Sequence, residues 1–560
     1  MTREIELNEH DRFKARLLKY LPSRAKLTET QVEEHIAHML CIRHNTPWQK
    51  DIPEEIFLSF VLPMHVNDEP IVPCAKLFYS QLMPMLSGMD AMTAAIQVNY
   101  YCMANVTYRF NDAPTSDVLT IFNRGYGRCG EESTFAVLAY RSVGIPARQV
   151  YAVKWSHCED NHAWVEIYVN GQWHYTGACE AQEKLDCGWF DTASSKAQYI
   201  RALCDCERLD PYIASENGRA VENVTDRYAA AGTLKLQVKN GAEPCPNARL
   251  SVELFNTGNF DRLFTLECDE RGEASAILGM GDVFITHYSE NGFCRVKATP
   301  PSAVIDIAHG TPDGAYEYTQ RVAEGRDPHL HASDEWRTGL SNRRRELLHP
   351  GSHTPWVRPE PVPEKGAHEV RVETDYDIIQ GFGGNFSIAR ITQDGTQKLD
   401  LDKNSPATLH IAAGRYCFNA YRRGLDGTLY IKSLVKQIDS DCTLKLSMPN
   451  AEAKPLNAPA ALPFEDRCGK TLLLLCGGDD EPTRHIESEL KEQENTLISR
   501  EIRTLRIDTV PCDALERVRE LMHISGDALP ILVAVKDGMG LHAVCGYNVG
   551  SVELLCELLR

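Results

Sequence analysis

The fold is decided by one stretch of the chain, which reads NRGYGRCGEESTFAVLAYRSVGIPARQVY over residues 123–151. Gly125 and Gly127 are turn residues directly before a helical run, and Gly144 follows that run, so the pattern predicts a helix that begins near Cys129. A cysteine at a helix N-terminus lies where the macrodipole and the free backbone N–H groups favour thiolate over thiol. Cys129 is therefore a candidate nucleophile.

Two acidic residues, Glu131 and Glu132, follow Cys129 in the first turn of this helix. They suit the positive end of the helix, but they would raise the pKa of the thiol if they pointed toward it. The sequence leaves open which effect prevails.

A second informative stretch reads NHAWVEIYVNGQWHYTGACE over residues 161–180. Its strict alternation predicts a strand with His162, Trp164 and Glu166 on one face. The pair Asn170-Gly171 then predicts a tight turn into a second strand. His162 is thus expected at the start of a hairpin.

A cysteine at a helix start and a histidine on a later strand can act together, because the imidazole can accept the thiol proton and form a pair that attacks acyl carbons. Taken alone, Cys129 is better explained as a buried core cysteine and His162 as a hydrogen-bonded strand histidine. Taken together with their flanks, the two residues favour a catalytic pair.

GRCGEESTFAVLAYRSVGIPAR followed by NHAWVEIYVNGQW resembles the transglutaminase-like superfamily, in a multidomain protein of bacterial type. The resemblance covers residues 86–215 and implies a papain-like core with Cys129 as nucleophile and His162 as base. This superfamily includes transglutaminases, peptide N-glycanases and bacterial thiol peptidases. The resemblance therefore implies acyl chemistry on amides without fixing the acceptor.

The third catalytic residue departs from the family pattern, in which an Asp usually follows the Trp of the second strand. Counting four residues on from Trp173 gives Gly177. The nearest carboxylate, Glu180, is a candidate for orienting His162, or else a loop or helix-capping acid. Asp160 is too near His162 in sequence to be the first choice.

The oxyanion partner and the cleft walls are less well defined by the sequence. Asn123 lies six residues before Cys129 and is a candidate oxyanion donor, or else an ordinary turn residue. Trp155 and Trp164 are candidates for walling the acyl site, although packed core aromatics are the alternative for both.

The whole chain of 560 residues is expected to be an α+β multidomain protein, because single cores stop growing near about 300 residues. Short alternating strands predict two β-sandwiches, and a Pro-rich stretch between them predicts a linker. The expected parts are a helical region 1–85, a transglutaminase-like catalytic domain 86–215, a β-sandwich 230–307, a linker 308–366, a second sandwich 367–450 and an α/β domain 466–560.

The last part alternates strands and helices in an order that resembles the thioredoxin-like class, with Pro530 where that class keeps a cis-proline. Its first strand is followed by CGGDDEP, which has no CxxC, so a non-redox module is expected. A redox protein that works through Cys476 or Cys468 is a further hypothesis for the whole chain. It has little support, because neither cysteine has a resolving partner.

Composition and charge limit the binding partners and the cellular compartment that we expect for this protein. The chain carries 59 basic and 78 acidic residues, a net charge of −19 that does not suit nucleic-acid binding. The N-terminus lacks the features of a secretory signal, and no apolar run is long enough for a membrane span, which favours a cytoplasmic protein. The 19 cysteines show neither disulfide nor zinc spacing, so no metal is expected.

These observations predict a cysteine acyltransferase or amidohydrolase that acts on a peptide or protein substrate, with Cys129, His162 and Glu180 as its catalytic residues and no cofactor. The alternative is a noncatalytic scaffold that uses the same fold to bind peptide, protein or glycan. The missing Asp supports this alternative, and the retained Cys129 and His162 oppose it.

Overall fold

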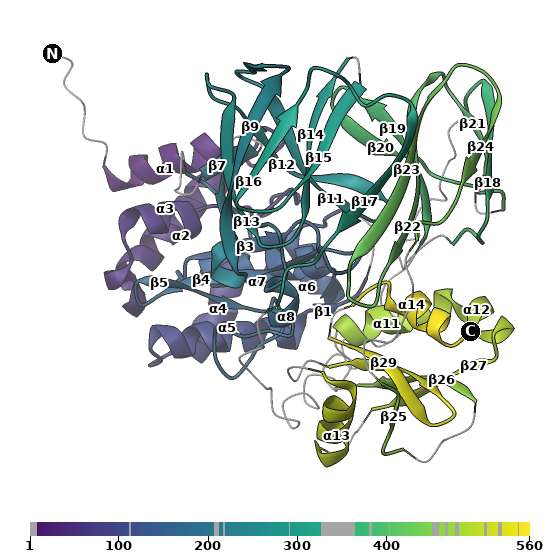
Figure 1. Cartoon of the computed structure of the whole chain (residues 1–560). Coiled ribbons are helices and arrows are strands. Elements are labelled where there is room, and N and C mark those ends of the chain that lie inside the picture. Colours follow the sequence, from purple (N-terminus) through teal and green to yellow (C-terminus); the bar gives the residue numbers. More distant parts are fainter. Residues whose placement is uncertain are drawn as a thin grey trace.

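A computed structural model describes the chain from residue 8 to residue 560 except for 111–113, 207–211, 217–218, 291, 326–364, 380–383, 403, 451–457, 465–468, 477–480, 509–511, 525–528 and 547. Along the chain, a helical and sheet part is followed by two all-strand parts and a C-terminal α/β part, which lies at the bottom right of Figure 1. The protein is a mixed α/β chain with several sheets, as its sequence predicts.

The first part contains helices packed around a central helix, α7 (Cys129–Ser142). Every residue of α7 from Gly130 to Ser142 is buried, which explains why its sequence shows no polar face. The surrounding elements are α1 (Glu9–Tyr20), α2 (Glu29–Asn45), the 3₁₀ helix η1 (Pro47–Asp51), α3 (Glu54–Phe60), α4 (Ala75–Leu86), α5 (Ala91–Asn105) and α6 (Val118–Arg124).

The helices before residue 86 share one hydrophobic core with α7 and the sheet beneath it. Phe78 of α4 packs edge-on against Phe135 of α7 at a ring distance of 5.4 Å. The indole N–H of Trp48 donates to the carbonyl of Val143 at 3.1 Å. The helical region expected at 1–85 is thus packed against α7 and its sheet.

One face of α7 rests on a six-stranded sheet with the order β5-β4-β3-β6-β8-β7. A two-residue parallel pair, β1 with β2, lies next to the start of α7. The strands are β1 (Thr107–Tyr108), β2 (Tyr126–Gly127), β3 (Ala147–Ala152), β4 (His162–Val169), β5 (Gln172–Thr176), β6 (Ile200–Cys204), β7 (Tyr212–Glu216) and β8 (Arg219–Asn223), with the short helices α8 (Asp191–Ser194) and α9 (Thr225–Tyr228).

The alternation seen in the sequence of β4 has a structural reason on the far side of the sheet from α7. Glu166 is buried and pairs with Arg148 at 2.6 Å, while Arg148 also pairs with Glu222 at 2.5 Å. The Arg148 guanidinium lies over the ring of Trp173 at 4.1 Å. This ion-pair network ties β4 to β3 and β8 and so fixes the strand that carries His162.

Two β-sandwich-like modules follow, and each contains two sheets. The first has the orders β10-β9-β13, with β16 also on β9, and β12-β11-β14-β15. Its strands are β9 (Ala231–Asn240), β10 (Glu243–Pro244), β11 (Arg249–Asn256), β12 (Asn259–Glu267), β13 (Glu273–Gly279), β14 (Val283–Ser289), β15 (Gly292–Ala298) and β16 (Ser302–Asp306).

The second module has the orders β17-β23-β22-β19-β20 and β21-β18-β24. Its strands are β17 (Gly314–Gln320), β18 (His368–Thr374), β19 (Phe386–Thr392), β20 (Gly395–Lys398), β21 (Thr408–Ile411), β22 (Gly414–Arg423), β23 (Leu429–Ile438) and β24 (Cys442–Leu446). Strand β17 lies within the predicted linker and pairs with β23, because the alternating segment GAYEYTQ adds an edge strand to this sheet. Most of the rest of that linker lies outside the described residues.

The C-terminal part has one sheet of order β25-β29-β28-β26-β27, in which β26 runs parallel to β27 and antiparallel to β28. The peptide bond before Pro530 is cis. The thioredoxin-like assignment remains a prediction. The elements are β25 (Ala460–Ala461), β26 (Lys470–Leu475), α11 (Glu481–Glu492), α12 (Glu494–Ser499), β27 (Ile502–Ile507), α13 (Cys512–Met522), β28 (Ile531–Lys536), β29 (Met539–Cys545) and α14 (Ser551–Leu558).

The C-terminal part packs against the first part and against the second sandwich-like module. Val549, just before α14, belongs to the same buried cluster as Trp155 and Cys158 of the first part. Arg422 of β22 pairs with Glu557 of α14 at 3.1 Å. In Figure 1 the helices α11 and α14 lie on the side of this part that faces the rest of the chain.

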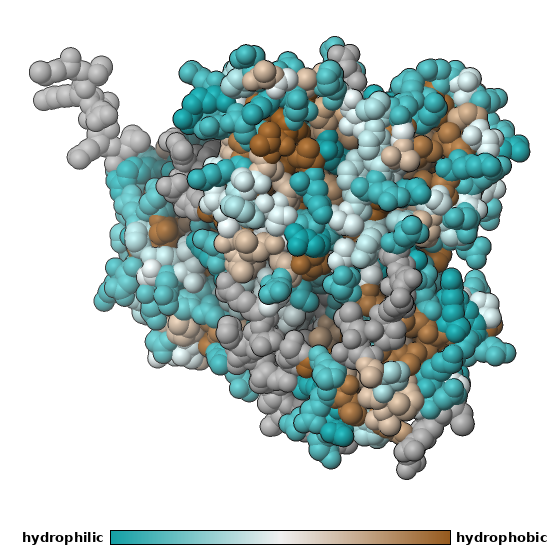
Figure 2. Space-filling view, in the orientation of Figure 1, coloured by the Kyte–Doolittle hydropathy of each residue, from teal (hydrophilic) through white to brown (hydrophobic). Residues whose placement is uncertain are grey.

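The surface in Figure 2 is mostly hydrophilic, with brown patches over the first sandwich and in the C-terminal part. None of the helices in the described residues combines the length and the apolar character that crossing a bilayer requires.

Candidate active site

Cys129 is the first residue of α7 and is half-buried. Glu131 does not point at its sulfur, because the Glu131 carboxylate accepts hydrogen bonds from the backbone N–H of Ser116 at 3.0 Å and that of Arg128 at 3.3 Å, and pairs with Arg124. One of the two acids next to Cys129 is therefore used to cap the helix. This cap fixes the turn from which the thiol projects.

His162 is the first residue of β4, and its side chain is almost fully buried. Its ring lies among aromatic rings, at 4.5 Å from that of Trp189 and 5.3 Å from that of Phe190. Neither ring nitrogen has a hydrogen-bond partner within the described residues. The imidazole is therefore held by packing, and its lone pair and N–H remain available for chemistry.

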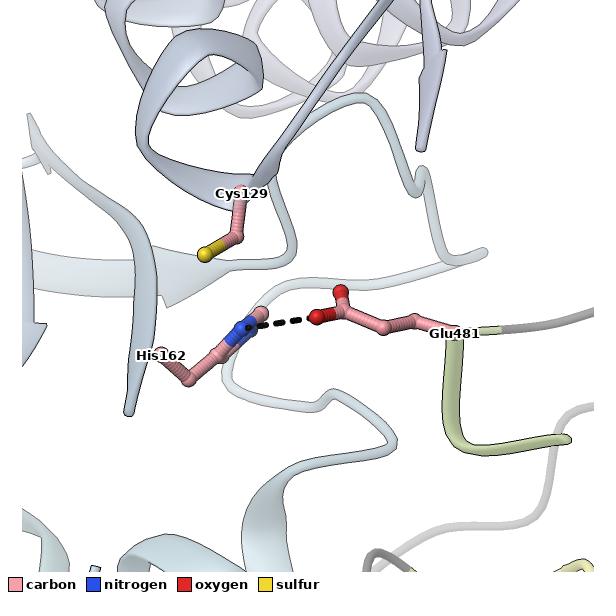
Figure 3. A group of neighbouring side chains, drawn as sticks. All are labelled: Cys129, His162 and Glu481. Carbon is pink, nitrogen blue, oxygen red and sulfur yellow. Dashed lines mark ion pairs between the residues drawn. The ribbon is translucent and has the colours of Figure 1, made fainter. Parts of the chain in front are cut away.

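The thiol, the imidazole and a third side chain, Glu481, form one buried cluster (Figure 3). One atom from each residue, the sulfur, a ring nitrogen and a carboxylate oxygen, lies within 4.8 Å of the other two. Oε1 of Glu481 lies 3.8 Å from Nδ1 of His162. The structure thus brings the two predicted residues together and adds an acid from the C-terminal part.

Burial dominates the electrostatics of this cluster. It raises the pKa of the Cys129 thiol well above its usual value, and the negative charges of Glu481 and Asp160 raise this pKa further. A hydrogen bond from the backbone N–H of Ala163 lowers it. Burial, followed by His485, lowers the pKa of His162 to about 3. Burial therefore opposes the expected effect of the helix N-terminus on the thiol, and the shifts of both pKa values favour a neutral thiol beside a neutral imidazole.

Glu180, predicted to orient His162, is buried and accepts a hydrogen bond from the indole N–H of Trp189 at 2.5 Å. It makes no hydrogen bond with either ring nitrogen of His162 among the described residues. A Cβ on Gly177 would lie 3.3 Å from Oε2 of Glu180, so this carboxylate lies against position 177, where the family's Asp is missing. The predicted direct contact between Glu180 and the imidazole is thus absent among the described residues, and the two side chains are linked through the Trp189 ring.

The other two predicted site residues do not line the thiol. Asn123 is exposed near the end of α6. Trp164 is fully buried, and its ring packs at 4.8 Å from that of Phe190 and at 6.4 Å from that of Trp155. Trp164 supports the ring layer beneath His162.

A cavity of about 190 Å³ opens beside Cys129. Its lining is mostly polar and includes Asn67, Gln149, Arg128 and Arg201. This cavity can receive a polar group next to the sulfur.

A second polar cluster adjoins the first and comes from two distant parts of the chain. Tyr108 Oη lies 2.8 Å from Nε2 of His485, and the same nitrogen lies 3.7 Å from Asp160 and 3.7 Å from Glu481. Arg484 donates to the carbonyl of Tyr108 at 3.1 Å. Sequence reasoning missed Glu481 and His485, because no local pattern relates α11 to residues more than 300 positions earlier.

Thiol, imidazole and carboxylate are also a set of ligands that zinc accepts. Only the group Cys129, His162 and Glu481 meets this description among the residues that the structure describes.

Residues 85–177 match the family model of the transglutaminase-like superfamily. The matched span contains both Cys129 and His162. The chain carries a transglutaminase-like domain. The match ends at Gly177, before Glu180, so the family model itself covers neither the predicted acid nor Glu481.

Solved structures that resemble the chain include a transglutaminase from red sea bream, with 11% identity over 75% of this chain and 74% of that one, and a TM-score of 0.20. They also include a protein from Cytophaga hutchinsonii that has been proposed to be a cysteine protease, with 18% identity and a TM-score of 0.17. The alignment covers 19% of this chain and 37% of the Cytophaga protein. None of the curated proteins compared with the chain matches it.

Proposed function

We propose that the transglutaminase-like domain is a cysteine-dependent acyltransferase or amidohydrolase that acts on carboxamide or peptide bonds of peptides or proteins. One observation carries the proposal: Cys129 at the N-terminus of α7 and His162 on β4 meet in one cluster, within 4.8 Å. The N-terminus of a helix such as α7 is a place where backbone N–H groups can serve as donors to an oxyanion.

The reaction starts when His162 accepts the thiol proton as the sulfur of Cys129 attacks the carbonyl carbon, which forms a carbon–sulfur bond. The carbon–nitrogen bond then breaks, and His162 returns the proton to the leaving amine or ammonia. Water or a second amine attacks the thioester, and the thiol is regenerated. The raised pKa of Cys129 and the lowered pKa of His162 describe the site at rest, before a substrate is bound.

Trapping the thioester tests this proposal. The protein is incubated with a mixture of amidated and glutamine- or asparagine-containing peptides, and the masses of its cysteine peptides are measured with and without hydroxylamine. An acyl adduct on Cys129 that hydroxylamine removes is expected, and it should be absent in Cys129→Ala but present in Cys41→Ala, which changes an exposed cysteine on α2.

A noncatalytic binding scaffold is the second candidate, and two observations favour it. Position 177 has no acid, and the thiol–imidazole pair is neutral with a carboxylate beside it. A chain that gives no adduct yet binds the same peptides equally well as wild type and as Cys129→Ala would support the scaffold.

A further inference from the structure

The first turn of α11 reaches into the cluster of Cys129 and His162. Glu481 begins this helix, and His485 follows one turn later; both side chains are at least 95% buried. His485 contacts Tyr108 and Asp160 of the catalytic part, and Arg484 donates to the Tyr108 backbone. Three contacts, two to Tyr108 and one to Asp160, therefore hold the start of α11 against the site.

The position of the Glu481 carboxylate differs from that of the acid in a catalytic triad. A triad acid and its nucleophile contact opposite nitrogens of the imidazole, which places them about 7 Å apart given normal hydrogen-bond lengths. Here the carboxylate oxygen lies within 4.8 Å of the Cys129 sulfur. Figure 3 shows the thiol and the carboxylate approaching His162 together.

A group next to both the sulfur and the imidazole occupies the place of a reacting acyl carbon, which in a productive complex lies about 3–3.5 Å from the nucleophile. A carboxyl group is also what hydrolysis of an amide leaves behind at this place. Glu481 therefore occupies the site in the manner of a bound product.

The charges around Glu481 fit this arrangement. Burial is the main reason that the pKa of Glu481 rises to about 7. His485 lowers this pKa, while the charges of Glu180 and Asp160 raise it. A pKa raised in this way lets the Glu481 carboxyl group keep its proton more readily than an exposed glutamate, which is compatible with a neutral His162 and Cys129 beside it.

We propose that the first turn of α11 is an intramolecular occupant of the acyl site, so that substrate and the C-terminal part compete for the same place beside Cys129. The inference rests on the proposed role of Cys129 and adds a regulation of that site. The seated form is closed, and acyl transfer requires this turn to leave.

The test compares two reagents in the full-length chain, iodoacetamide and a biotin-bearing iodoacetamide, which share one reacting group but differ in size. Their rates at Cys129 are measured by mass spectrometry in wild type, in Glu481→Lys and in Glu494→Lys. Glu494 is the matched control because it is an exposed acid that begins the neighbouring helix α12. The ratio of the two rates is independent of the thiol pKa, because both reagents meet the same thiolate.

We expect Glu481→Lys to raise the ratio of the bulky to the small reagent about tenfold, as release of a well-populated closed form requires. Glu494→Lys should leave it at the wild-type value. A ratio in Glu481→Lys equal to that of wild type overturns the proposal, whatever the individual rates do. His485→Ala, which removes the contacts to Tyr108 and Asp160, should shift the ratio in the same direction as Glu481→Lys.

This measurement is separate from the test of the proposed function, since alkylation needs an accessible thiol but no catalysis. A chain that forms no thioester and still shows the change in ratio would retain the intramolecular occupant and lose the enzymatic proposal. Thioester formation with an unchanged ratio would support the enzymatic proposal and contradict the intramolecular occupant.

Discussion

The Glu180 carboxylate accepts a hydrogen bond of 2.5 Å from the indole N–H of Trp189. The Trp189 ring lies 4.5 Å from the imidazole of His162, so the acid nearest position 177 contacts this histidine through a tryptophan. The resting position of His162 thus depends on aromatic packing more than on hydrogen bonding.

Trp189→Phe tests this support, because it keeps a ring against His162 and removes the N–H that Glu180 accepts. Losing a donor to a buried carboxylate costs about 1–3 kcal/mol, so we expect a lower midpoint of urea unfolding. Glu180→Gln keeps an acceptor oxygen and should cost less. If the double variant Trp189→Phe/Glu180→Gln loses the full sum of the two single losses, the two side chains act independently and the support is absent.

Arg148 should be among the most sensitive positions of the transglutaminase-like domain. It is buried and pairs with Glu166 and Glu222, so Arg148→Met leaves two buried carboxylates without this partner and is expected to cost about 3–5 kcal/mol. Chemical unfolding followed by tryptophan fluorescence measures the loss. Arg371→Met, which changes an exposed arginine on β18 paired with Glu369, is the control and should change the midpoint little.

The pH dependence of alkylation at Cys129 follows from its raised pKa. Because only thiolate reacts, the logarithm of the iodoacetamide rate should rise by about one per pH unit through neutrality and keep rising past pH 9. Glu481→Gln removes a negative charge and should move the curve to lower pH. A plateau already reached below pH 7 in wild type would show a preformed thiolate–imidazolium pair and contradict the neutral resting pair.

The stability of the C-terminal part should fall as pH rises. Burial raises the pKa of Glu489 to about 8, against hydrogen bonds from the backbone N–H groups of Gly550 and Val552. A carboxyl group whose folded pKa exceeds its unfolded value contributes most below the unfolded pKa, and this contribution is lost between about pH 4.5 and pH 8. Thermal unfolding at pH 5, 7 and 9 should show a decreasing midpoint.

Glu489→Gln provides the comparison, since a glutamine does not titrate. It should flatten this dependence on pH while shifting the midpoint by a constant amount. Equal slopes in wild type and variant would assign the pH dependence to other groups, among them Glu553, whose pKa burial also raises to about 8.

Local patterns were sufficient to predict the two elements that carry the candidate nucleophile and base. Glycine turns and a helical run placed Cys129 at the start of α7, and strict alternation placed His162 at the start of β4. The start of α7 and the start of β4 each depend on residues within a few positions along the chain, and sequence patterns report on structure over this range.

Long-range packing could not be predicted in the same way. The thiol pKa depends on how deeply Cys129 is buried, and the acid beside it arrives from α11. The sequence predicts a linker where strand β17 lies, because a partly exposed edge strand followed by a Pro-rich stretch shows little hydrophobic signal. In each case the deciding partner lies more than 100 residues away.

Because Glu481 follows His162 by a long stretch of sequence, the ribosome makes the two residues at different times. Chains grow at about 5–20 residues per second, so the 319 residues between these positions correspond to roughly half a minute. The thiol and imidazole are both in place on the growing chain well before α11 has been made. The proposed closure of the site by Glu481 therefore follows the formation of the Cys129–His162 pair, and the growing chain passes through an open form.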